Sequence, residues 1–120
     1  MASSLTLYTL KTCDTCRKAR RVLEAAGFDV KAIDLREDAD LADRVPIWLR
    51  AEPEALINKS SATWRALSTG DKARAATNPA ALLKAHPTLI KRPVIEQGEK
   101  ILVGFGRDVQ AALGVLQTAT

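Results

Sequence analysis

The residues best suited to chemistry are Cys13 and Cys16, the only two cysteines in a chain of 120 residues. They form a Cys-x-x-Cys pair between a short apolar segment and a basic one. A pair of this spacing where a strand meets a helix is typical of thiol–disulfide chemistry. The pair therefore predicts a redox-active site near the N-terminus.

The two sulfurs are expected to have different roles. Cys13 lies at or just before the first turn of a helix predicted over residues 14–26, where free backbone N–H groups and the helix dipole favour a thiolate. Lys11, Arg17 and Lys18 add positive charge nearby. Cys16 lies on the same side of the helix and begins its apolar stripe, so it should be the more buried sulfur. We expect Cys13 to attack and Cys16 to resolve the mixed disulfide. The stripe comprises Cys16, Ala19, Leu23 and Ala26.

Other interpretations of these residues stay open. A zinc site would need further ligands, and the chain has no second cysteine pair and a single histidine, His86, so no metal is expected. Two inert cysteines are a further alternative. The basic cluster is either a solvated helix face or a surface that attracts an anionic thiol such as glutathione, and the absence of interleaved aromatic residues argues against direct nucleic-acid binding. The cluster comprises Lys11, Arg17, Lys18, Arg20 and Arg21.

The elements that must position the pair follow from the apolar patterns. Residues 5–9 and 28–35 alternate as strands on either side of the first helix, which Gly27 ends, so they should pair in parallel. Residues 93–96 and 100–103 predict a hairpin, and a last helix is expected over 107–117 with Val109, Leu113 and Leu116 inward. This order predicts an α/β sheet of about four mixed strands with a central helical insertion.

The insertion is alanine-rich and helical. Leu41, Val45, Trp48 and Leu49 share one face of a helix that Pro46 either splits or starts. Residues 79–85 predict a short helix with an asparagine N-cap at 78 and proline at its first position. Trp64 and Leu67 mark another apolar stripe. We expect one domain over 1–120, with a βαβ segment at 1–36, the insertion at 37–86 and a ββα segment at 87–120.

Composition sets the class of protein. Apolar residues make up 47% and charged residues 27%, as in ordinary soluble domains, and the net charge of +4 suits an anionic substrate. The start of the chain lacks the features of a signal peptide, and no apolar run reaches the ~20 residues of a membrane span. We expect a cytoplasmic protein that contacts no membrane, where a lone cysteine pair is more often catalytic than structural.

Pro93 follows Arg92 directly before the hairpin. Proline cannot donate to a strand ladder, so it belongs at a strand start. A cis bond here would set a backbone edge beside Cys13, whereas a trans bond would simply enter an edge strand; the residues alone leave both open.

Several segments, taken together and in order, resemble the ArsC/Spx family of arsenate reductase-like proteins, which have a thioredoxin-like fold with a helical insertion. Within it the chain is most similar to the YffB-like branch, for which glutathione-dependent thiol reduction has been suggested. The matching segments span nearly the whole chain; they are residues 11–20, 55–59, 63–65, 86–93 and 102–105.

The resemblance implies roles for particular residues. Cys13 falls at the family's nucleophile, and Arg92-Pro93 at its cis-proline site near the thiol. Of the three arginines that hold the oxyanion in arsenate reductases, Arg92 matches one. Asn58, followed by Lys59, and Gly104 stand where the other two would be, and Arg107 is off register. Guanidinium groups suit a dianion, and asparagine or glycine cannot replace their charge, which argues against efficient arsenate reduction.

The resemblance thus implies a thiol-dependent reductase with no bound cofactor and with glutathione, or a glutaredoxin-type reductant, as its thiol. Cys13, Cys16 and Arg92 would be catalytic. An alternative is an Spx-like redox switch that binds RNA polymerase, and a weaker one is a true arsenate reductase. The expected substrate or thiol contacts are Lys11, Thr12, Arg17, Asn58, Lys59 and Pro93.

Overall fold

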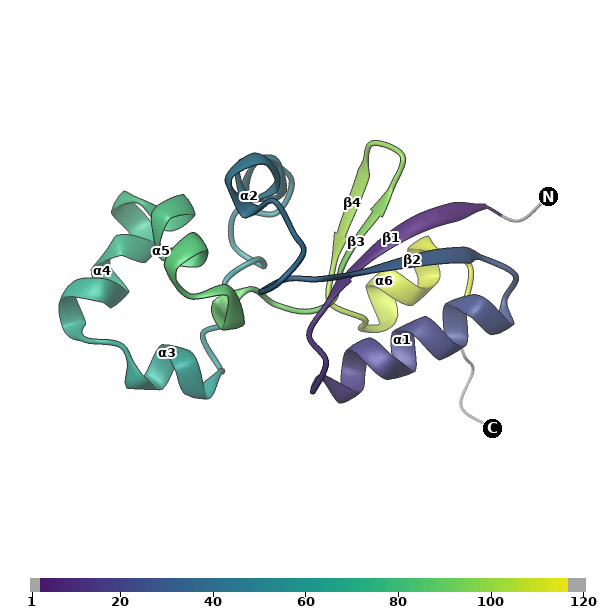
Figure 1. The fold of residues 1–120 in the computed structure, drawn as a ribbon, viewed down its shortest axis with the longest axis horizontal. Helices are drawn as coiled ribbons and strands as arrows, with labels where there is room; N and C mark the ends of the chain where they lie inside the picture. Colours follow the sequence, from purple (N-terminus) through teal and green to yellow (C-terminus); the bar gives the residue numbers. More distant parts are fainter. Residues whose placement is uncertain (1–2, 117–120) are drawn as a thin grey trace. The chain divides into compact units, whose positions relative to one another are not determined.

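The structure, a computed structural model, describes residues 3–116 (Figure 1). Its contacts divide the chain into two compact units. The sheet unit comprises Met1–Asp38 and Arg92–Thr120, and the helical unit comprises Ala39–Lys91. Each unit is described by itself below.

The sheet unit contains four strands in the order β2-β1-β3-β4. β1 and β2 pair in parallel, while β1 pairs with β3 and β3 with β4 in antiparallel fashion. The predicted mixed sheet of four strands is therefore confirmed. The elements are β1 (Ser4–Thr9), α1 (Asp14–Ala25), β2 (Asp29–Asp34), β3 (Val94–Gln97), β4 (Lys100–Val103) and α6 (Arg107–Ala112).

Two glycines make the reversals that this topology needs. Gly27 follows the α1 C-cap with φ of +95°, a left-handed conformation that ends the helix and turns the chain into β2. Gly98 has φ of +59° in the turn between β3 and β4, where Gln97 pairs with Lys100. The helix end at Gly27 and the hairpin that turns at Gly98 were both predicted, and the structure confirms them.

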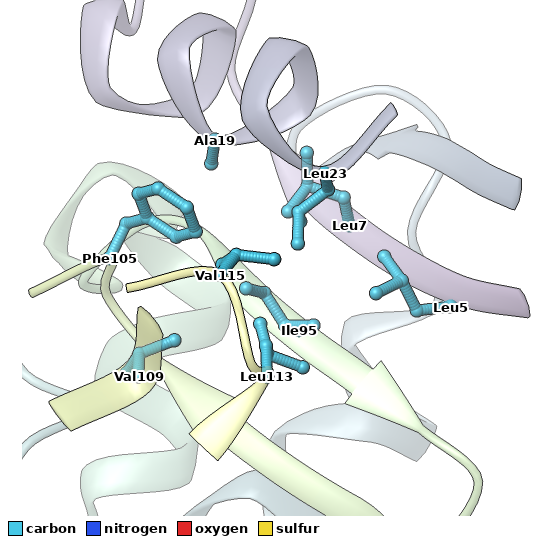
Figure 2. Close-up of a cluster of buried hydrophobic side chains, with 9 residues drawn as sticks. All are labelled: Leu5, Leu7, Ala19, Leu23, Ile95, Phe105, Val109, Leu113 and Val115. Carbon is cyan, nitrogen blue, oxygen red and sulfur yellow. The ribbon is translucent and has the colours of Figure 1, made fainter. Parts of the chain in front are cut away.

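Helices α1 and α6 cover the same face of the sheet (Figures 1 and 2). Leu5 and Leu7 point from β1 and Ile95 from β3 into one apolar cluster, because alternate residues of a strand share a face. The helices and the segments beside α6 supply the other side chains of the cluster. These are Ala19, Leu23, Phe105, Val109, Leu113 and Val115.

Two expected core positions are wrong. Ala26 is exposed because α1 ends at Ala25, which leaves residue 26 as the C-cap beyond the stripe. Leu116 is 38% exposed, and Val115 is buried in its place. The cause is that α6 ends at Ala112 and a left-handed Gly114 turns the chain, which breaks the helical spacing. The predicted helix end at residue 117 lies outside the described residues.

The helical unit consists of short helices that begin at capping side chains. Asn78 caps α5 by accepting from the N–H of Ala81 at 3.3 Å, with Pro79 at the first position, as predicted. Pro46 neither splits nor starts its helix but lies inside α2, of which Val45 and Trp48 are buried. The helices are α2 (Leu41–Ala51), α3 (Ala62–Ala66), α4 (Thr69–Thr77), α5 (Pro79–Ala85) and the 3-10 helix η1 (Pro87–Leu89).

The core of the helical unit is apolar, and a backbone bridge closes it. Ile57 pairs with Ile90, and Asn58 N–H donates to Leu89 O at 2.8 Å. Across residues 3–116, no helix has the length and apolar character that a membrane crossing requires. The fully buried side chains of the unit are Val45, Trp48, Leu56, Leu82, Leu83, Leu89 and Ile90.

Candidate active site

Cys13 is the N-cap residue of α1. A turn after β1, closed by Cys13 N–H donating to Leu10 O at 3.1 Å, sets its extended backbone, with φ of −93° and ψ of 110°. Its sulfur then accepts from the N–H of Cys16 at 3.3 Å. A sulfur thus occupies the place that a serine or aspartate oxygen usually takes at a helix start, where the helix dipole favours negative charge.

The surroundings of Cys13 favour its thiolate. Partial burial opposes ionisation, but hydrogen bonds from the Cys16 thiol and backbone, together with the hydrogen bond and charge of Arg92, outweigh it. These contacts lower the pKa of Cys13 below its ordinary value. The direction agrees with the predicted activation. The two hydrogen bonds from Cys16 contribute more to the lowered pKa than Arg92, whose guanidinium adds a hydrogen bond and a positive charge.

Cys16 has the opposite character. It is 2% exposed, the first residue of the buried stripe on α1, as predicted. Burial, with the hydrogen bond and charge of Cys13, raises the pKa of Cys16 to about 12, although a hydrogen bond with Leu10 opposes the change. The pair therefore combines one thiol that ionises readily with one that keeps its proton, and both are free thiols.

Two of the other expected cations, Lys11 and Arg17, have acidic partners. Lys11 Nζ pairs with Glu37 Oε2 at 3.0 Å, and both side chains are exposed. Arg17 bonds to Asp14 Oδ1 and donates to the Lys11 carbonyl at 3.0 Å. Lys11 is thus paired with Glu37, and its expected role in stabilising the Cys13 thiolate stays a prediction. Asp14 lies within the Cys-x-x-Cys motif itself, whereas Glu37, in the turn that follows β2, was not expected near the site.

Arg92 and Pro93 lie on the chain that enters β3. The Arg92–Pro93 bond is cis, as the family resemblance implied. Pro93 is buried, and its carbonyl accepts from the N–H of Gly104 at 2.8 Å. Gly104 has φ of +83°, a conformation that favours glycine and that an arginine would adopt only with strain.

A cavity of about 230 Å³ lies beside the pair in the sheet unit. Cys16 lines it, although almost none of the Cys16 surface is exposed. The cations Lys11, Arg17 and Arg20 border the same cavity. Thr12 is exposed in the turn before Cys13. The remaining lining residues are Thr9, Leu10 and Ala32.

Asn58 and Lys59 belong to the helical unit, whereas Cys13 belongs to the sheet unit. The Asn58 side chain accepts from the N–H of Ser60 at 3.1 Å, which fixes a local turn. Lys59 lines a separate cavity with Trp64 and Lys72, a grouping that sequence spacing does not reveal. Among the described residues, no group of three His, Cys, Asp or Glu could hold a metal ion.

Comparisons with known proteins define the class. The ArsC family model matches residues 8–113, so the chain belongs to the ArsC family. An uncharacterised protein of Haemophilus influenzae is 38% identical, over 90% of this chain and 97% of its own. The global transcriptional regulator Spx of Listeria innocua is 27% identical, over 87% of this chain and 82% of its own.

Solved structures agree with this assignment. The chain is similar to a structure described as the YffB protein, with a TM-score of 0.79 and 32% identity over 94% of this chain and 99% of the other. It is also similar to an arsenate reductase (ArsC) related protein from Brucella melitensis, with a TM-score of 0.74 and 33% identity over 94% of this chain and 97% of the other. The predicted family and its fold are confirmed.

Proposed function

We propose that the chain is a thiol-dependent reductase that uses Cys13 as nucleophile and glutathione as the reducing thiol. The observation that carries the proposal is the asymmetry of the pair. Cys13 at the α1 N-cap has a lowered pKa, while burial and the neighbouring sulfur raise the pKa of Cys16 to about 12. A low pKa gives the attacking thiolate, and a high pKa keeps the second thiol protonated until the mixed disulfide forms.

The reaction follows in three exchanges. The Cys13 thiolate attacks one sulfur of a disulfide substrate, which forms a Cys13 mixed disulfide and releases the other half as a thiolate. Cys16 then loses its proton and attacks Cys13 Sγ, which releases the second half as a thiolate and leaves a Cys13–Cys16 disulfide. Two glutathione molecules reduce that disulfide and leave as oxidised glutathione, so two electrons pass from glutathione to the substrate.

Arg92 would serve the same site twice. Its hydrogen bond and charge stabilise the Cys13 thiolate. In the mixed disulfide that negative charge is gone, and the guanidinium can hold a carboxylate of the glutathione half. Lys11, Thr12, Arg17 and Pro93 stay predicted contacts of the substrate or thiol, and so do Asn58 and Lys59.

Two further candidate functions come from relatives. An arsenate reductase-related structure is similar to this chain, but Asn58 and Gly104 replace two oxyanion arginines, and the positive φ of Gly104 resists restoring one. Similarity to Spx supports a second class, a regulator whose Cys13–Cys16 disulfide alters an RNA polymerase-binding surface. The enzyme turns over disulfides, whereas the switch forms one disulfide and stops.

Trapping of the mixed disulfide tests the proposal. The purified Cys16→Ser variant, exposed to oxidised glutathione, should gain one glutathione on Cys13 by mass spectrometry, and Cys13→Ser should gain none. Wild type should turn over a glutathione mixed disulfide, and Cys13→Ser should not. A wild-type chain that forms only its internal disulfide, without turnover, would favour the switch, and polymerase pull-down would then test that function. An unmodified Cys16→Ser variant would overturn the proposed chemistry.

A further inference from the structure

The helical unit holds a second cavity, which neither cysteine lines. It measures about 300 Å³, and an indole with two ammonium groups borders it. Lys59 Nζ lies 5.5 Å from the centroid of the Trp64 ring, and Lys72 Nζ lies 6.0 Å from the same centroid. Trp64 is half-buried on α3, Lys72 is half-buried on α4, and Lys59 is exposed before α3.

The two lysines differ from the other cations of these helices. Arg74 pairs with Asp71 at 3.6 Å, and Arg65 donates to the Ser60 carbonyl at 2.9 Å. Within residues 3–116, neither Lys59 nor Lys72 has an ion-pair partner. Two positive charges held at one ring repel each other, and the attraction of each to the indole face offsets only part of this. A bound anion would relieve the repulsion.

The other residues that line the cavity indicate which class of ligand would fit it. Glu54 is exposed and borders the same cavity, so its carboxylate cancels part of the positive charge. Apolar surface comes from Pro53, Ile57 and the alanines of α4. Together these groups suit a ligand with a single anionic group on a flat apolar body, which the indole can contact while the ammonium groups hold the charge.

From this grouping we propose that the cavity between α3 and α4 binds a small organic anion, a carboxylate or a phosphate ester with an apolar body. The site contains neither Cys13 nor Cys16, so the proposal does not rest on thiol chemistry, and Lys59 is the one residue that it shares with the predicted reductase contacts. Lys59 and Lys72 contribute charge, and Trp64 contributes a contact face. The two possible anions share one negatively charged oxygen group attached to a flat apolar body.

Nuclear magnetic resonance can test the site, because the chain has only two indole N–H signals. Trp48 is fully buried and serves as the internal reference for Trp64. Benzoate and phenyl phosphate are titrated separately into the ¹⁵N-labelled full chain at low salt, with benzyl alcohol as the uncharged control. We expect saturable shifts of the Trp64 signal with at least one anion, no saturation with the alcohol, and weaker binding as salt is added. The better-bound anion decides between carboxylate and phosphate.

Charge variants make the test specific. Lys59→Gln and Lys72→Gln should each weaken binding by up to about fivefold, the upper end for an exposed ion pair, while Glu54→Gln should strengthen it. Lys84→Gln, which removes an exposed lysine on α5, should change nothing. The proposal is overturned if neither anion saturates the Trp64 signal, or if Lys84→Gln weakens binding as much as the cavity variants. Binding that persists in Cys13→Ser would separate this result from the reductase proposal.

Discussion

Replacement of Arg92 by glutamine should change the reactivity of Cys13 in opposite directions at low and high pH. Arg92 lowers the pKa of Cys13 through a hydrogen bond and through its charge. A charge-assisted hydrogen bond contributes ~1.5–3 kcal/mol, and we take the lower end because both side chains are only half-buried. Since ~1.4 kcal/mol is a factor of ten, the thiolate fraction of Cys13 should be about tenfold smaller in Arg92→Gln than in wild type. This holds at pH values below the Cys13 pKa of both proteins.

The rate falls less than the thiolate fraction, because a more basic thiolate is a better nucleophile. With a Brønsted slope of ~0.4–0.5, each thiolate of the variant reacts about threefold faster. Alkylation of Cys13 in the variant should therefore be about threefold slower than in wild type at low pH. It should be about threefold faster at a pH where Cys13 is fully ionised in both proteins. The two pH–rate curves should therefore cross.

Iodoacetamide alkylation followed by mass spectrometry measures this site by site. Cys16 keeps its proton to a pKa of about 12, so it should stay unmodified over most of the pH range. Arg107→Gln, an exposed arginine of the same unit, is the matched control and should follow wild type. Curves that run parallel, with the variant slower at every pH, would mean that Arg92 acts on access or folding and would refute the electrostatic argument.

Other expected outcomes concern stability. The Cys13→Ser variant should lose melting temperature more steeply above about pH 9 than the double variant Cys13→Ser, Cys16→Ala. Burial raises the folded-state pKa of Cys16, so the unfolded chain releases that proton first and is favoured as pH rises. Equal slopes for the two variants would contradict this. Leu23→Ala should lower the free energy of unfolding by ~2–5 kcal/mol in urea titrations, whereas Leu116→Ala should change it by less than ~0.5 kcal/mol. Gly104→Arg should cost at least ~1–2 kcal/mol, because φ is +83° and the position is buried, and a melting curve that matches wild type would refute the strain.

Much of the fold could be predicted because its signals are local. The alternation of β1, the stripe that starts at Cys16 and the glycine at 27 each specify one element within a few residues. The N-cap role of Cys13 was predictable for the same reason, since a cap depends on the next turn of its own helix. The prediction that Leu116 is buried was wrong because the helix ends before it. Gly114 turns the chain one residue before Val115, so the helical spacing of apolar residues no longer holds at Leu116.

The site was only partly predictable, because charge depends on partners. From the sequence, Lys11 and Arg17 looked like the cations that would activate Cys13, since they are its neighbours along the chain. In the folded chain, Lys11 instead forms an ion pair with Glu37, and Arg17 forms one with Asp14. A net positive run therefore predicts a basic surface but not which cation faces the thiol.

Arg92 shows what the sheet adds. It is far from Cys13 in sequence, yet β3 pairs antiparallel with β1, and the turn that follows β1 carries Cys13. The register that aligns Tyr8 with Val94 therefore places the residues before β3 at the same edge as the start of α1. The contribution of Arg92 to the lowered pKa of Cys13 depends on this pairing. Changes that disturb the β1–β3 ladder should consequently alter Cys13 reactivity even where they touch neither cysteine.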